Sequence, residues 1–176
     1  EMIRKSEDEI LKRMKRILRK KMSAKRTRIH GDYHLGQVLN TGKDFVILDF
    51  EGEPARPISE RRLKHSPLKD VAGMIRSIHY VAYSYFMTRP KLQAEQMNLL
   101  ESWIEPWYLY VSGVFFGAYM QTVNESKIIP RENGELETLL QTFLLEKGIY
   151  ELGYELNHRP DWITIPIRGI EYLLVS

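Results

Sequence analysis

Acidic and amide side chains gather in one short stretch of the chain, residues 28–54, at a spacing that suits phosphoryl transfer. Asp32 directly follows Gly31, in the sequence His-Gly-Asp-Tyr-His. A glycine at that position permits a tight loop and the close approach of a substrate. A carboxylate on such a loop can accept, or simply orient, the proton of a hydroxyl that attacks a phosphoryl group. We therefore interpret Asp32 as a candidate catalytic base.

The other polar residues of this stretch suit a hard metal ion. Asp49 and Glu51 end an apolar run and lie two residues apart, so on an extended strand they share one face. Gln37 adds an amide oxygen. The chain has no cysteine, and oxygen ligands favour Mg²⁺, which is usually held by one or two carboxylates with phosphates and water. We therefore expect a nucleoside triphosphate to supply the phosphate ligands of the ion.

Two histidines flank Asp32. For His30 the favoured interpretation is a buried side chain that bonds to backbone and shapes the loop. His34 stays open between loop scaffold and substrate contact. Taken singly, Gly-Asp and Asp-x-Glu are weak patterns, but their order along the chain matches the catalytic loop and metal segment of a phosphotransferase.

The elements that must position these groups are mostly helices. Apolar residues at helical spacing predict helices over 2–22, 68–88, 91–124, 135–156 and 167–174. Ser66-Pro67 is typical of a helix start, residues 52–64 predict a loop, and Pro106 predicts a break in the 91–124 helix. Trp103, Trp107, Tyr108 and Phe115 are expected in the core. The sequence thus predicts a single-domain, mostly helical α+β fold over 1–176, in which a small β-hairpin within 28–54 carries the acidic groups.

Composition narrows the function classes. The 176 residues have 43% hydrophobic content and a net charge of +3, and no apolar run is long enough to span a membrane. Residues 1–30 hold 12 Lys/Arg against 4 Asp/Glu, but no aromatic residue interrupts this basic run, so a solvated helix face is favoured over nucleic-acid binding. The absence of cysteine and of a signal-peptide pattern predicts a cytoplasmic protein without membrane contact.

Longer segments of the sequence resemble a known family. The order His30-Gly31-Asp32-x-His34-x-x-Gln37, followed by Asp49-Phe50-Glu51, is similar to that of aminoglycoside-phosphotransferase-like kinases, distant relatives of protein kinases. The segments HGDYHLGQVL, ILDFEGEPARPISERR, SPLKDVAGMIRS and FLLEKGIYELGYELNHRPDWITIPIRGI together resemble the maltokinases, which occur alone or fused to trehalose synthase.

The resemblance implies ATP-dependent phosphorylation of maltose at its anomeric hydroxyl, giving maltose 1-phosphate. By motif position, Asp32 is the catalytic base, and Gln37 and Asp49 hold Mg²⁺. Glu51 either supports a second metal ion or orders the loop. Asp70 matches a position that braces the catalytic loop through backbone amides, a structural role shared with His30.

A sugar site needs side chains that stack on sugar faces and bond to hydroxyls. Besides His34, the candidate substrate-binding residues lie in one segment at the end of a predicted helix and the turn after it: Tyr150, Tyr154, Glu155, Asn157, Arg159 and Trp162. Tyr150 and Tyr154 are four apart and share a helix face. The alternative, that Tyr150 and Trp162 are core aromatics and Arg159 caps a helix, stays open.

The resemblance covers only the C-terminal lobe of a kinase-like fold. No strand-rich, glycine-rich segment with an early lysine precedes Arg28, so we expect the nucleotide-gripping N-terminal lobe to lie elsewhere in a longer polypeptide and this chain to have little activity alone. Two alternatives remain: a non-catalytic assembly or regulatory module of a trehalose synthase fusion, and a related kinase with another hydroxyl acceptor.

Overall fold

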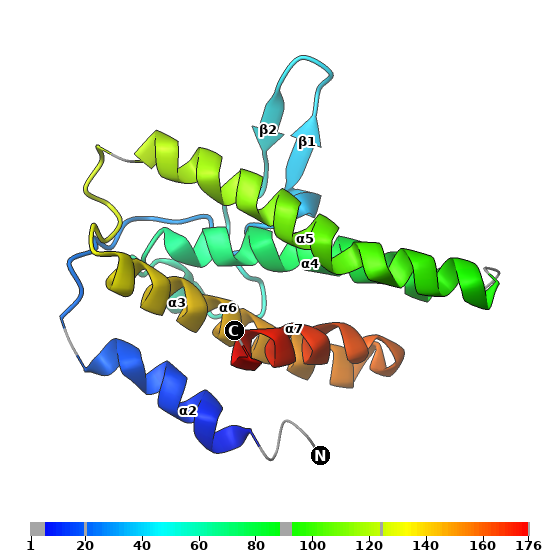
Figure 1. Cartoon of the computed structure of the whole chain (residues 1–176). Coiled ribbons are helices and arrows are strands. Elements are labelled where there is room, and N and C mark those ends of the chain that lie inside the picture. The colour runs from blue at the N-terminus through cyan, green and yellow to red at the C-terminus, as the bar shows by residue number, and fades with distance from the viewer. Residues whose placement is uncertain (1–5, 20, 89–92, 124, 176) are drawn as a thin grey trace.

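The chain forms a bundle of helices from which one small β-hairpin projects (Figure 1). The computed structural model describes residues 6–19, 21–88, 93–123 and 125–175. Over these ranges the fold is mostly helical α+β with a single two-stranded sheet, which confirms the predicted fold class. No helix in the described ranges is both long enough and apolar enough to cross a membrane.

The core lies between four helices. Helix α4 (Leu68–Thr88) packs against both α5 (Ala94–Val123) and α6 (Asn133–His158), and α7 (Thr164–Val175) covers α6. Their apolar faces meet in one cluster, because each helix repeats its large aliphatic residues every three or four positions. The most deeply buried members are Leu68, Val71, Ala72, Met74, Leu139, Leu145 and Ile170.

The start of α4 agrees with the sequence prediction. The Ser66 hydroxyl accepts a hydrogen bond from the Leu68 amide at 3.4 Å, and Pro67 directly precedes the first helical residue. This start matters because α4 carries Asp70 in its first turn, next to the loop that bears Asp32.

The first helix is shorter than predicted. Helix α2 spans Glu7–Lys15 and continues as a 3₁₀ turn, η1 (Arg16–Leu18), rather than as one helix to residue 22. Ile10 is buried, and the Arg13 guanidinium donates to the carbonyl oxygens of Leu173 and Leu174 at the end of α7. The predicted start at residue 2 lies outside the described residues.

The hairpin forms later in the sequence than Arg28. Strand β1 (Val38–Asn40) pairs antiparallel with β2 (Phe45–Ile47) in the register Val38–Ile47, Leu39–Val46 and Asn40–Phe45. A 3₁₀ turn, η2 (Leu35–Gln37), leads into β1. Asp32 therefore lies on a loop before the hairpin, while Asp49 and Glu51 follow β2.

Three local predictions were wrong. The predicted loop 52–64 contains a short helix, α3 (Ile58–Arg61). Helix α5 runs through Pro106 without a break, since Pro106 lies on the exposed side, where water can satisfy the one carbonyl that loses its partner. Trp103 and Trp107 are 65% and 44% exposed, because they share that side, whereas Tyr108 faces the core.

The C-terminal part of the chain differs from the prediction only in the exact bounds of its helices. Helix α6 extends to His158, and the predicted turn after it is a 3₁₀ helix, η3 (Pro160–Trp162). Helix α7 begins at Thr164, so Pro166 lies within its first turn rather than before it.

Candidate active site

The loop that carries Asp32 is held by the first turn of α4. The Asp70 carboxylate accepts hydrogen bonds from the His30 amide at 2.7 Å and from the Gly31 amide at 2.9 Å. Gly31 has φ +88°, a conformation that favours glycine. These two bonds fix the backbone directly before Asp32.

His30 joins this loop to the end of the hairpin. Its Nδ1 accepts a hydrogen bond from the Asp32 amide at 3.3 Å, so Nε2 carries the proton and donates to the Leu48 carbonyl at 2.6 Å. The ring is buried and lies against the Tyr33 and Phe50 rings. His30 thus connects the Asp32 loop to the chain that follows β2.

Close backbone packing brings α4 against the same loop. A Cβ on Gly73 would lie 2.6 Å from the Tyr33 carbonyl oxygen, so only glycine lets the helix approach at this point. The Leu35 amide also donates to the Ser77 hydroxyl, one turn further along α4. The loop therefore rests on α4 along more than one turn.

The Asp32 carboxylate is partly shielded and lies between a histidine and a lysine. Lys147 Nζ, from α6, is 3.3 Å from Asp32 Oδ1, and His34 Nε2 is 3.7 Å from Oδ2. The Asp32 side chain is 17% exposed. His34 accepts a hydrogen bond from the Gly36 amide through Nδ1, so it also caps η2.

The structure brings together two of the three predicted metal ligands. Gln37 Nε2 lies 2.9 Å from Asp49 Oδ2, across the base of the hairpin. Asp49 has φ +59°, a left-handed conformation that aspartate adopts more often than most other non-glycine residues. Glu51 is exposed, and its backbone oxygen lies 3.5 Å from the Arg61 guanidinium. Among the described residues, no three histidine or carboxylate side chains converge on one point.

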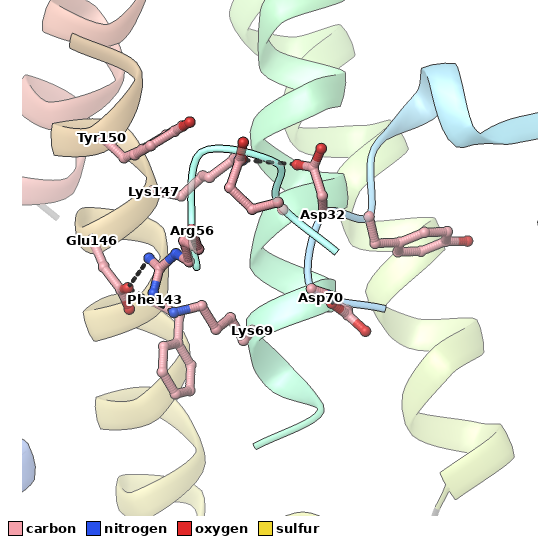
Figure 2. A pocket seen from close by; sticks show the side chains of 12 residues that line it. Asp32, Arg56, Lys69, Asp70, Phe143, Glu146, Lys147 and Tyr150 are labelled. Carbon is pink, nitrogen blue, oxygen red and sulfur yellow. Dashed lines mark hydrogen bonds and ion pairs between the residues drawn. The ribbon is translucent and has the colours of Figure 1, made fainter. Parts of the chain in front are cut away.

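A small cavity below Asp32 is lined by charged residues of α4, α6 and the loop after β2 (Figure 2). Its floor is an ion cluster in which Glu146 accepts from Lys69 at 2.6 Å and from Arg56 at 3.2 Å. Burial opposes the ionisation of Glu146, but the two cations outweigh this effect and lower its pKa. The cluster ties α6 to α4 directly beneath the loop that carries Asp32.

A second, larger cavity of about 430 Å³ opens beside Asp32. Of the predicted substrate-binding residues it is lined by His34, Tyr150, Tyr154, Glu155 and Arg159. The other two do not line it: Asn157 donates to the Gly153 carbonyl of its own helix, and Trp162 lies under the Arg159 guanidinium at 4.6 Å.

One wall of this cavity contains two ion pairs whose carboxylates are largely buried. Arg76, which is 2% exposed, donates two hydrogen bonds to Glu151 at 2.8 and 2.6 Å. Glu155, 1% exposed, accepts two from Arg159 and one from the Tyr80 hydroxyl. Buried charges that are fully paired hold their geometry, because leaving either partner unpaired is strongly unfavourable.

Burial and a nearby carboxylate change the pKa of Tyr150, a tyrosine that lines the cavity. Burial, together with the charge of Glu53 and a hydrogen bond to it, raises the pKa of Tyr150 to about 12. Tyr150 thus stays a neutral hydrogen-bonding group across the working pH range. Asp70 also has a raised pKa, because burial outweighs the two backbone donors.

Sequence reasoning missed Lys147, Glu53, Arg76 and Glu151. Lys147 and Glu151 had a detectable signal, since positions 147, 150, 151 and 154 fall on one helix face together with both candidate tyrosines. Glu53 directly precedes Pro54 in the central stretch. Arg76 had no signal, because its partner lies 75 residues away in sequence.

Two known proteins that are similar to this chain are both named glucosamine kinases. A glucosamine kinase of Mycolicibacterium smegmatis is 30% identical over 152 residues, which are 82% of this chain and 34% of that protein. One from Streptacidiphilus jiangxiensis is 24% identical over 146 residues, 83% of this chain and 31% of that protein. The relatives are sugar kinases. No protein-family model matches the chain.

Solved structures give the same result for the fold. A glucosamine kinase in complex with glucosamine, ADP and inorganic phosphate matches with a TM-score of 0.67 and 25% identity over 82% of this chain and 34% of that one. Another crystal form matches with a TM-score of 0.69 at 24% identity, over 84% of this chain and 33% of that one. The chain spans about a third of the length of the relatives that it matches.

Proposed function

We propose that this chain is the acceptor-binding lobe of an ATP-dependent sugar kinase, and that its acceptor is maltose, phosphorylated at the anomeric hydroxyl to give maltose 1-phosphate. The observation that carries the proposal is the placement of Asp32 at the edge of the 430 Å³ cavity, on the loop that leads to the Gln37–Asp49 pair. The sugar kinases among the relatives support the reaction class. The resemblance to maltokinases supports the acceptor.

In this proposal the cavity binds the sugar, and Asp32 handles the proton. Tyr150 and Tyr154 offer aromatic faces to the apolar faces of the rings. Asp32 orients the acceptor hydroxyl and takes its proton as the oxygen attacks the γ-phosphorus of ATP. The bond from that phosphorus to the β–γ bridging oxygen breaks, and ADP leaves. Lys147 keeps the Asp32 carboxylate in place during this step.

Gln37 and Asp49 are the residues that would hold Mg²⁺. Their oxygen atoms suit a hard cation, and with two protein ligands the remaining positions fall to nucleotide phosphates and water. The ion would neutralise the charge of the phosphates when bound. The Gln37 amide nitrogen donates to Oδ2 of Asp49, which leaves Oδ1 of Asp49 and the Gln37 amide oxygen for the ion. Glu51 is proposed only as a support of this segment.

The nucleotide also needs a partner lobe, which we place over the hairpin. Leu39, Phe45 and Val46 are 52%, 68% and 43% exposed in this chain. A two-stranded hairpin is marginal by itself, and exposed apolar groups of this kind favour a covering surface. The remaining two thirds of a relative-sized polypeptide would supply that lobe. A fused trehalose synthase domain remains a further proposal.

Glucosamine is the second candidate acceptor, favoured by the names of the relatives. The first experiment therefore offers maltose, glucose, glucosamine and an aminoglycoside, with ATP and Mg²⁺, to the full-length parent polypeptide. Formation of an anomeric phosphate on maltose, followed by ³¹P NMR, is the expected result. Transfer to glucosamine but not to maltose would contradict the maltose assignment.

The decisive variant is Asp32→Asn in the same polypeptide. It keeps the shape of the side chain but removes its ability to take a proton, so kcat should fall about 10²- to 10⁴-fold with an unchanged thermal midpoint. Unchanged transfer in Asp32→Asn would defeat the catalytic role and favour a non-catalytic assembly or regulatory module. This chain alone should show little or no turnover.

A further inference from the structure

The acceptor cavity has an acidic lining that the chain itself neutralises. Four carboxylates line it, and each has a cationic partner within the chain: Asp32, Glu53, Glu151 and Glu155. Arg76 and Arg159 pair with the latter two at 2.6 Å and are therefore fixed parts of the wall. The other two carboxylates, Asp32 and Glu53, share one lysine as their cationic partner.

Lys147 is the shared partner of Asp32 and Glu53. Its Nζ lies 3.3 Å from Asp32 Oδ1 and 3.8 Å from Glu53 Oε2, and 5.0 Å from the centre of the Tyr150 ring. Within the described ranges, no other lysine or arginine comes within 4.0 Å of either carboxylate. The lysine is 27% exposed, so it lies inside the site rather than on the outer surface.

The Lys147 ammonium lies between two carboxylates, which is where a protonated amine would be attracted most strongly. Two carboxylates beside a reacting hydroxyl would attract a protonated amine strongly, because opposite charges at such distances interact well even near a protein surface. With Lys147 present, half of that negative charge is neutralised, and the ammonium itself repels a second cation. An uncharged sugar loses nothing by this arrangement and gains a hydrogen-bond donor.

We propose that Lys147 sets the charge selectivity of the acceptor site, so that the site takes uncharged sugars in preference to their amino analogues. This inference rests on the proposed sugar-kinase function and deepens it. In this inference the charge of one side chain favours an uncharged acceptor over an amino sugar such as glucosamine, which the names of the relatives contain. Lys147 is thus a specificity-determining residue.

The test uses the full-length parent polypeptide and matched acceptor pairs, glucose with glucosamine and maltose with 2-amino-2-deoxymaltose. The measured quantity is the ratio of kcat/KM for the amino sugar to kcat/KM for the uncharged sugar. Lys147→Gln removes the charge and should raise this ratio about tenfold, equivalent to about 1.4 kcal/mol. Lys147→Arg keeps the charge and should leave the ratio within about threefold of wild type.

Two further variants make the result specific. Lys69→Gln removes a lysine of the neighbouring cluster that pairs with Glu146, so the ratio should stay at the wild-type value. Glu53→Gln removes negative charge instead and should shift the ratio about tenfold in the opposite direction. If Lys147→Gln does not fold, as shown by loss of its thermal transition, Glu53→Gln is the deciding variant. An unchanged ratio in Glu53→Gln then overturns the inference.

The possible failures are distinguishable. A wild-type protein that phosphorylates no sugar defeats the proposed function, and the inference falls with it. An active wild-type protein that prefers the amino sugar, or whose ratio stays within about twofold in Lys147→Gln, defeats the charge-selectivity inference alone. An equal effect of Lys69→Gln and Lys147→Gln also overturns it, because the effect would then not depend on contact with Asp32 and Glu53.

Discussion

The position of Asp32 depends on several neighbouring residues. Its amide donates to His30 Nδ1, the two preceding amides donate to Asp70, and its carboxylate meets Lys147. A base on a mobile loop would lose most of its effect, since small displacements weaken catalysis strongly. The residues around Asp32 therefore serve mainly to keep it in one position.

His79, on α4, is a buried histidine away from the proposed chemistry. It is 2% exposed, lies between the rings of Tyr83 and Tyr108, and leaves Nδ1 without a partner in the described structure. Burial, with the charges of Arg76 and Arg168, lowers the pKa of His79 to about 2. The folded protein thus keeps this ring neutral.

This neutral histidine predicts a loss of stability in acid. Below about pH 6.5 the unfolded chain binds a proton at position 79 that the folded chain refuses, so the free energy of unfolding falls as the pH falls. From pH 7 to pH 5 the expected contribution is about 1–2 kcal/mol. His79→Phe keeps the aromatic contacts and should remove this part of the loss, measured by urea unfolding at both pH values. An equal pH dependence in variant and wild type would count against the prediction.

At the scale of elements, one glycine, Gly73, lets α4 pack closely against the loop that carries Asp32. Gly73→Ala would place a methyl group 2.6 Å from the Tyr33 carbonyl oxygen, so helix or loop must shift. We expect a loss of about 1–3 kcal/mol in unfolding free energy. In the parent polypeptide we also expect reduced phosphoryl transfer, because Tyr33 adjoins Asp32.

Gly113→Ala is the matched control for this prediction. Gly113 also lies in a helix, but a Cβ there meets open space. Alanine should stabilise α5 by about 0.5–1 kcal/mol through its higher helix propensity. Thermal unfolding of the two variants gives the comparison, and equal shifts for both would show that close approach at Gly73 is unimportant.

The elements also show what the sequence could reveal. Helical spacing located α4, α6 and α7 well, because their buried faces repeat every three or four residues. It failed at Pro106, Trp103 and Trp107, since a local pattern does not show which side of α5 meets another helix. Gly113 and Gly117 on the same helix also have open space where a Cβ would lie.

For the candidate site, the sequence could pair residues that lie close together along the chain but not residues that lie far apart. Gln37 and Asp49 lie 12 residues apart and were paired from the sequence, and the structure places them within 2.9 Å. Lys147 lies 115 residues from Asp32. No local pattern joins such residues, so the contact between Lys147 and Asp32 became visible only in the folded structure.

At the scale of the whole molecule, the strands of the hairpin are largely exposed in this chain. Phe45→Lys changes a side chain that is 68% exposed, so unfolding of this chain by urea should change by no more than about 0.5 kcal/mol. In the parent polypeptide the same change should lower the thermal midpoint and the kinase activity, because a partner lobe would lose apolar contact there.

Leu18→Lys provides the control for the hairpin prediction. Leu18 is 81% exposed on η1, far along the chain from the hairpin, and should tolerate lysine both in this chain and in the parent polypeptide. Equal tolerance of Phe45→Lys and Leu18→Lys in the parent would mean that no lobe covers the hairpin.

The two ends of the candidate site differ in how they can change during evolution. The phosphate end is encoded by one continuous segment that could be inherited as a unit. The proposed acceptor end takes much of its lining from a distant helix, α6, where substitutions leave that segment unaltered. Substitutions on this one helix could therefore redirect such a kinase to a new sugar while its phosphoryl chemistry stays unchanged, and relatives with different acceptors are the expected outcome.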